Sequence, residues 1–147
     1  MESLGWQIGE TANALKRLFG RRAAELGVTS AQWRVMGQLI HHPGTRQAAL
    51  AERLDIEPIT LTRTVDRLEE AGLVERRPDP ADRRVRQLHL TAAAEPLVEK
   101  LRAIAAELNS QVFAGLQPNE LDACQRMLAL IRENIAVSEC VKKAKSA

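Results

Sequence analysis

One stretch of the chain, residues 73–90, interrupts a pattern that is otherwise helical from end to end, and this limits the available folds. Leu73–Arg77 and Arg84–Leu90 have the residue types of short strands, and Pro78 and Pro80 mark turns between them. Elsewhere the apolar residues recur at helical spacing. Aromatic residues make up only 3% of the chain and Tyr is absent, which excludes an all-β architecture. The sequence predicts a mainly α protein with one small β-hairpin and no other β structure.

The first helices are marked by their apolar spacing and by their ends. One helix begins near Leu4 and stops before Gly27, and a second opens with a capping box formed by Thr29 and Gln32. A short alanine-rich helix over residues 48–54 follows. These three helices come before any strongly basic segment.

The next helix begins at Pro58 and ends before Gly72, with Leu61, Val65 and Leu68 on one face. A short helix, a turn, a second helix and a basic hairpin follow the order of a winged helix-turn-helix, whose second helix can enter a DNA major groove. If the three apolar residues face the core, the side chains that project outward are Ile59, Thr60, Arg63, Asp66 and Arg67.

After the hairpin the sequence predicts two long helices, the first capped by Thr91 and delayed by Pro96. Their apolar stripes, and that of the N-terminal helix, suit pairing with another helix, so we expect a homodimer. Cys124 lies on the apolar face of the last helix and is expected in a core. Only Cys140 accompanies it, without CxxC spacing, which favours a reducing cytoplasm over a disulfide-rich secreted module or a zinc site.

Positive charge is concentrated in the hairpin. The whole chain carries a net charge of only +2, but the segment Arg76–Arg86 holds five arginines against two aspartates. These arginines repel one another unless an anion such as phosphate neutralises them, and arginines at the tip suit a narrow minor groove. Asp82 is expected to pair with Arg84, and Asp79 is explained by turn chemistry. For the helix that carries Arg63 and Arg67, the alternative is an ordinary solvated face. For Asp82 and Arg84, the alternative is a surface ion pair without function.

Two segments are similar to a known family. Asp82–Thr91 (DRRVRQLHLT) resembles the wing signature of the MarR family of bacterial transcription regulators, and Ile56–Leu73 resembles its recognition helix. Ala94–Leu97 (AEPL) resembles the SlyA branch of that family, and the resemblance extends from about Leu4 to Ile135. It implies a dimer of intertwined terminal helices with two winged lobes, recognition helices in successive major grooves of a pseudo-palindromic operator, and wing arginines in the flanking minor grooves.

The resemblance also implies roles for individual residues. Thr60 and Arg63 would read bases, Arg84 together with Arg83 would occupy the minor groove, and Asp82 would orient Arg84. Thr45 or Arg46 would contact phosphate. The predicted DNA-binding set is Thr45, Arg46, Ile59, Thr60, Thr62, Arg63, Arg67, Arg83, Arg84 and Arg86.

Members of this family often respond to small aromatic anions bound between the dimer helices and the winged lobe. The candidate pocket residues here are Trp33 and Met36 as an apolar wall and Arg17 and Arg22 as cations. The alternative is that Trp33 and Met36 simply belong to the core. The resemblance thus implies double-stranded DNA and a second copy of the chain as partners, with an aromatic carboxylate as effector.

We expect a single domain over residues 1–147, with a winged lobe at 29–91, a helical dimerisation region at 1–28 and 92–140, and a frayed tail at 141–147. The sequence shows no signal peptide and no apolar run long enough to span a membrane, so a cytoplasmic, nucleoid-associated protein is expected. It also lacks catalytic motifs and predicts neither an enzyme nor a bound metal or cofactor. The alternative function is a winged-helix protein-interaction module without specific DNA binding.

Overall fold

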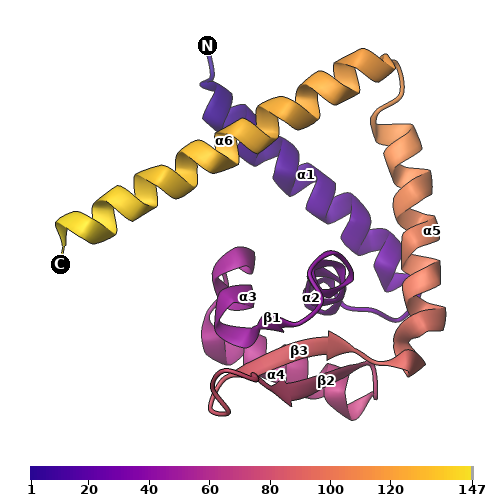
Figure 1. The fold of residues 1–147 in the computed structure, drawn as a ribbon. Coiled ribbons are helices and arrows are strands. Elements are labelled where there is room, and N and C mark those ends of the chain that lie inside the picture. Colours follow the sequence, from indigo (N-terminus) through magenta and orange to yellow (C-terminus); the bar gives the residue numbers. More distant parts are fainter. Residues whose placement is uncertain (147) are drawn as a thin grey trace. The chain divides into compact units, whose positions relative to one another are not determined.

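The structure, a computed structural model, describes residues 1–146 and confirms a mainly α fold with a small wing (Figure 1). The chain divides into two compact units, Met1–Leu108 and the described residues from Asn109 onward, which are described separately below. In chain order the elements are α1 (Leu4–Ala24), α2 (Ser30–His41), β1 (Thr45–Arg46), α3 (Gln47–Leu54), α4 (Pro58–Glu70), β2 (Val74–Pro78), β3 (Arg86–Leu90), a 3₁₀ turn (Ala92–Ala94), α5 (Glu95–Val112) and α6 (Pro118–Lys145).

The predicted helix ends are present in the structure. The Thr29 hydroxyl accepts a hydrogen bond from the Gln32 backbone N–H, and the Gln32 side chain accepts one from the Thr29 N–H, both at 3.1 Å. At the end of α4, Gly72 adopts a φ of +74°, and the Leu73 N–H donates to the Leu68 carbonyl at 2.9 Å. Glycine takes this left-handed conformation without steric cost, so it stops the helix and redirects the chain into β2.

The sheet contains a strand that the sequence analysis missed. Its order is β1-β3-β2, all antiparallel, with Thr45 opposite Leu88 and Arg46 opposite Gln87. The expectation of a hairpin alone was therefore wrong, because a strand of two residues is too short to show an alternating pattern. The extra strand joins the start of α3 to the hairpin.

Thr91 does not cap α5 as predicted. Its hydroxyl instead donates to the Gly72 carbonyl at 2.6 Å, and its backbone N–H donates to the Leu73 carbonyl at 3.0 Å. The 3₁₀ turn lies between Thr91 and α5, which begins at Glu95 with Pro96 in its first turn. Thr91 thus closes the base of the hairpin.

The core of the first unit lies on the predicted apolar face of α4. Leu61, Val65 and Leu68 are at most 1% exposed, as their spacing predicts. They belong to one cluster that draws on every element from α2 to α5 except β1, and its other buried members are Val35, Met36, Leu39, Leu50, Ala51, Leu54, Val74, Leu88, Ala94 and Val98. This packing fixes which face of α4 is turned to solvent.

A second set of contacts joins the hairpin to α4. Arg76 of β2 is largely buried, and its guanidinium lies 2.6 Å from the Asp66 carboxylate and 3.0 Å from that of Glu69, both on α4. Its Nε donates to the Gln47 side-chain oxygen on α3 at 3.1 Å. One side chain therefore links β2 to both helices of the helix-turn-helix.

Helix α6 forms most of the second unit and buries none of its residues. Cys124, expected in a core, is instead exposed, in keeping with a helix that buries none of its described residues. The helix continues to Lys145, so the residues 141–145 are helical where a frayed tail was expected; lysines in the last turn favour a helix C-terminus. Residue 147 of that tail lies outside the described residues.

Replacing Leu61 with Ala should lower the free energy of unfolding by about 2–5 kcal/mol, because it leaves a cavity in the core. The matched control on the same helix is Ile59→Ala, since Ile59 is 63% exposed; that variant should change stability by less than about 0.5 kcal/mol. Urea unfolding at one fixed protein concentration measures both. Equal losses from the two variants would show that the buried face of α4 is assigned incorrectly.

Replacing Arg76 with Ala should lower the free energy of unfolding by about 1–2 kcal/mol, because three side chains on α3 and α4 lose a charged partner. Arg77→Ala is the control: Arg77 is the neighbouring residue, is exposed, and pairs only with Glu75 among the described residues. Its loss should cost less than about 0.5 kcal/mol. Thermal and urea unfolding compare the two, and an Arg77→Ala variant as unstable as Arg76→Ala would contradict the assignment.

Candidate nucleic-acid interface

The solvent face of α4 carries most of the side chains predicted to read DNA. Ile59, Thr60, Arg63 and Arg67 are all exposed. The side chains of Arg63 and Arg67 form no hydrogen bond or ion pair with any described residue, so their guanidinium groups are available to an external partner. Thr62 differs, because it is half-buried and its hydroxyl accepts from the Gln47 side chain at 3.0 Å and donates to the Pro58 carbonyl at 2.9 Å.

A hollow of about 210 Å³ lies beside the outward face of α4. One wall is formed by Thr60, Arg63 and Arg67 of α4, and the other by Thr29 and Gln32 at the start of α2. Because the helix dipole places partial positive charge at the start of a helix, this wall adds positive potential to that of the two arginines. The hollow is electrostatically suited to an anion.

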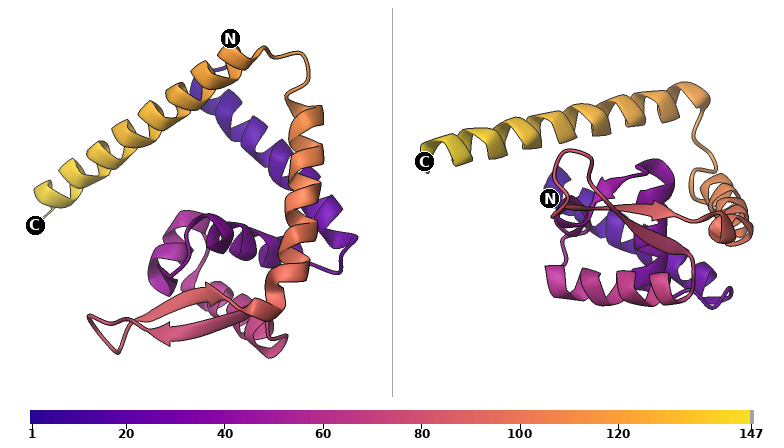
Figure 2. Two further views of the ribbon diagram at one scale, coloured as in Figure 1. Left: turned by 45° about the vertical axis from the view of Figure 1, so that its right-hand side comes forward. Right: turned by 60° about the horizontal axis from the view of Figure 1, so that its bottom comes forward.

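The tip of the wing is the second exposed basic element. The side chain of Arg84 is 92% exposed, and its Nε lies 3.3 Å from the Asp82 carboxylate, as predicted. The same carboxylate accepts the Arg84 backbone N–H at 3.0 Å, so Asp82 holds both the turn and the guanidinium. Arg83 and Arg86 are exposed and have no described partner. In the left view of Figure 2 the turn that carries these residues projects past the helices of the lobe.

The positive charge available at the hairpin is smaller than the sequence indicates. Of its five arginines, Arg76 and Arg77 are paired with acidic residues. The other three, Arg83, Arg84 and Arg86, are exposed near the tip. The hairpin thus has a neutralised base and a cationic tip.

Sequence analysis missed the role of Asp79, which it assigned to turn chemistry. The turn contact exists, since Asp79 Oδ1 accepts the Ala81 backbone N–H at 2.8 Å. However, Asp79 is only 4% exposed, and its Oδ2 also accepts from Arg46 Nε at 2.8 Å and from Gln87 Nε2 at 3.2 Å. Arg46 lies 33 residues away in the chain, so only the third strand reveals this contact.

Hydrogen bonding lowers the pKa of the Asp79 carboxyl below its ordinary value. The main cause is the Ala81 N–H, followed by the Gln87 amide and then Arg46. A carboxyl whose pKa is lower in the folded state stabilises the fold above the ordinary pKa of about 4, and this stabilisation is lost as the pH falls through the folded value. Asp79 is therefore ionised throughout the neutral range.

The two predicted phosphate contacts on β1 have different surroundings. Thr45 is half-buried, and its hydroxyl donates to the His42 carbonyl at 2.6 Å. Arg46 has a side chain that is 55% exposed, and only its Nε is used within the described chain. Of the two residues, Arg46 is therefore the one with side-chain N–H donors available to a phosphate.

The four candidate pocket residues do not gather at one place. Trp33 stacks on Phe19 with ring centroids 5.7 Å apart and lines a hollow of about 300 Å³. Met36 is fully buried in the core, and Arg17 is exposed on α1. Arg22 is held by two hydrogen bonds to the Glu107 carboxylate, at 3.0 and 3.1 Å, which raise the pKa of its guanidinium above the ordinary value.

The hollow beside Trp33 is lined by other cationic side chains instead. Lys16, Arg34 and Arg53 line it, together with His41 and the acidic Asp55. Trp33 Nε1 and the side-chain oxygen of Gln38 are buried without a hydrogen-bond partner among the described residues. The sequence pattern pointed to Trp33 but not to these cations, because they come from three different helices.

The described residues show neither a cluster that could hold a metal ion nor a helix that could cross a bilayer. No three of their His, Cys, Asp or Glu side chains are arranged to hold a metal ion. None of the described helices combines the length and the apolar character that crossing a bilayer requires.

Comparison with known proteins agrees with this geometry. Residues 26–85 match the MarR family. The crystal structure of transcriptional regulator PA3341 is similar with 33% identity and a TM-score of 0.82, over 91% of this chain and 98% of that one. A mutant MarR from E. coli complexed with operator DNA shares 26% identity, with a TM-score of 0.68, over 87% of this chain and 92% of that one.

A third structure shows the same fold at lower identity. It is a MarR family transcriptional regulator from Listeria monocytogenes complexed with 26mer DNA, with 22% identity and a TM-score of 0.80, over 94% of this chain and 92% of that one. The family match covers the helix-turn-helix and most of the wing, and the structural likeness extends over nearly the whole chain. On this evidence the chain belongs to the MarR family of winged-helix, DNA-binding transcription regulators.

Proposed function

We propose that this chain is a dimeric regulator that binds a pseudo-palindromic operator in double-stranded DNA. The observation that carries the proposal is the set of exposed arginines on two elements of one packed lobe, Arg63 and Arg67 on α4 and Arg83, Arg84 and Arg86 on the wing. Arg76 ties these two elements together, so their spacing is fixed before DNA binds. Preorganised cations favour a regularly spaced anion such as the phosphate backbone.

Helix α4 is the proposed reader of base edges in the major groove. Thr60 and Arg63 lie near its start, where a recognition helix reaches the bases. The free guanidinium of Arg63 can donate to O6 and N7 of guanine together, which discriminates against the wrong base by about 1–3 kcal/mol. The hydroxyl of Thr62 is already bonded within the lobe, so its proposed part is to hold α4 against Gln47.

The wing is the proposed contact to the minor groove. Arg84 has almost its full surface free, and Asp82 restricts its orientation. Arg83 and Arg86 add charge on either side. A narrow minor groove concentrates negative potential and attracts arginines of this kind. We propose a phosphate contact for Arg46.

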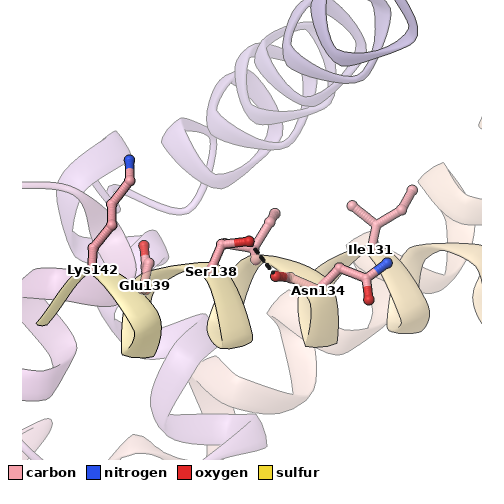
Figure 3. Close-up of a pocket in the computed structure, with 6 residues that line it drawn as sticks. Ile131, Asn134, Ser138, Glu139 and Lys142 are labelled. Carbon is pink, nitrogen blue, oxygen red and sulfur yellow. Dashed lines mark hydrogen bonds between the residues drawn. The ribbon is translucent and has the colours of Figure 1, made fainter. Parts of the chain in front are cut away.

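Dimerisation is proposed from the second unit. Helix α6 has no buried residue and exposes many large apolar side chains, which water disfavours. In Figure 3, Ile131, Asn134, Ser138 and Lys142 lie along one side of α6, beside a hollow of about 400 Å³ that Ile135 also lines. A second copy would cover such a face and place two lobes about a two-fold axis. The exposed apolar residues of α6 are Met127, Leu128, Leu130, Ile135, Val137 and Val141.

We further propose the hollow beside Trp33 as the site of a small aromatic carboxylate effector. It offers an aromatic wall from Trp33 and the basic side chains of Lys16, Arg34 and Arg53. Such a ligand changes DNA affinity only if it binds the DNA-competent and DNA-incompetent arrangements unequally.

We also propose that the chain belongs to the SlyA branch of the family, on the basis of the similarity of residues 94–97 to that branch.

Selection from a random-sequence duplex library tests the central proposal. The protein should enrich an inverted repeat, and affinity for the enriched duplex should fall with salt at a log–log slope of about −0.9 for each phosphate contacted. Sedimentation of the free protein should give twice the mass of one chain. Absence of any enriched sequence at low salt would instead favour a protein-interaction module.

The two arginines should differ in how their loss affects binding. Arg63→Ala should relax preference at one base pair per half-site, while Arg84→Ala should weaken binding to all sequences that share the flanking minor grooves. Repeating the selection with each variant separates these effects. Arg102→Ala on α5, where Arg102 pairs only with Glu95 and Glu99 among the described residues, is the control and should change neither. Sequence-blind losses of equal size from both variants would contradict this division of roles.

A further inference from the structure

A buried carboxylate at the root of the wing is unexpected on a surface that binds DNA. Asp79 lies between β2 and the tip, in the same hairpin as Arg83 and Arg84. It is ionised at neutral pH, so its charge repels the phosphates that the arginines attract. By electrostatics alone, the wing would bind DNA more tightly without it.

The contacts of Asp79 indicate what its charge does. One oxygen holds the wing turn through the Ala81 N–H, and the other joins Arg46 of β1 and Gln87 of β3. Gln87 and Arg46 face each other across the two strands. The Asp79 backbone N–H also donates to the Val85 carbonyl at 2.9 Å, which closes the turn. A single residue thus ties the wing turn to two strands.

The contact with Asp79 uses only Nε of Arg46 and leaves the terminal nitrogens of its guanidinium free. Asp79 binds Nε, whereas the two terminal nitrogens of Arg46 have no hydrogen-bond partner among the described residues. The Arg46 side chain is 55% exposed, so these terminal N–H groups are accessible, and a guanidinium with both of them free can bind a phosphate in a fork. Asp82 acts on Arg84 at the exposed tip, whereas Asp79 acts on Arg46 from a buried position just after β2.

We propose that Asp79 is a positioning residue for DNA binding, which holds Arg46 toward a phosphate and sets its distance from the wing tip. The inference rests on the proposed function, because it needs a DNA ligand. It deepens that function because Asp79 would hold Arg46 and the wing turn in a fixed relation to each other. An acidic residue then strengthens the binding of a polyanion.

The test replaces Asp79 with Asn, which has nearly the same shape but no charge. The probe is the duplex that the wild-type protein enriches most strongly from the random library. We expect about tenfold weaker binding, because a charge-assisted contact that orients Arg46 is lost. The salt slope should become less steep by about 0.9, the value of one phosphate contact. Equal or tighter binding, as simple removal of a negative charge would give, overturns the proposal.

Glu99→Gln is the matched control, since it makes the same chemical change at an exposed ion pair on α5. It should leave affinity and salt slope unchanged. Thermal unfolding establishes that each variant is folded at the temperature of the binding assay. If Asp79→Asn is unfolded there, Arg46→Lys takes its place: this variant keeps the charge but loses the planar fork, and it should weaken binding in the same way. Wild-type affinity of Arg46→Lys overturns the proposal.

A double-mutant cycle tests whether Asp79 acts through Arg46. In an Arg46→Ala background, Asp79→Asn should cause no further loss of affinity, because the oriented group is already absent. Full additivity of the two losses overturns the proposal. A wild-type protein that enriches no sequence overturns the proposed function together with this inference, whereas normal wild-type binding with an unaffected Asp79→Asn variant overturns this inference alone.

Discussion

The guanidinium of Arg76 is the interaction on which the geometry of the lobe depends. The apolar core fixes which face of α4 is exposed, but apolar packing is non-directional and specifies little about how a two-stranded hairpin leaves that core. Directional contacts from Arg76 to Asp66, Glu69 and Gln47 supply the missing constraint. The relation between the helix and the wing is therefore set by one largely buried guanidinium whose partners lie on two helices.

Pairing acids with some arginines and not with others gives the hairpin its electrostatic form. Near the base, Arg76 and Arg77 are paired with acidic residues, and Asp79 is bound between Arg46 and Gln87. The charged groups there stabilise the fold. Charge at the tip has only Asp82 as a partner. Counting charges along the sequence cannot separate these two uses, because the acids that make the difference come from other elements.

Local signals in the sequence predicted much of the fold. The Thr29 capping box, the Gly72 stop and the Leu61 face of α4 each depend on residues within one turn or one helix, and all three are present. The contact between Asp82 and Arg84 was also predictable, since only one residue separates them. What the sequence could not show depends on distant pairing: strand β1, the hydroxyl of Thr91 at the Gly72 carbonyl, and the burial of Asp79 against Arg46.

The absence of buried side chains on the described part of α6 has a consequence for the thermodynamics of the whole protein. A long helix that buries none of its described side chains gains little free energy beyond that of an isolated helix, which is marginal in water. Its order must then be linked by mass action to whatever covers it. For a helix covered by its own copy, the melting temperature becomes a function of how much protein the solution, or the cell, contains.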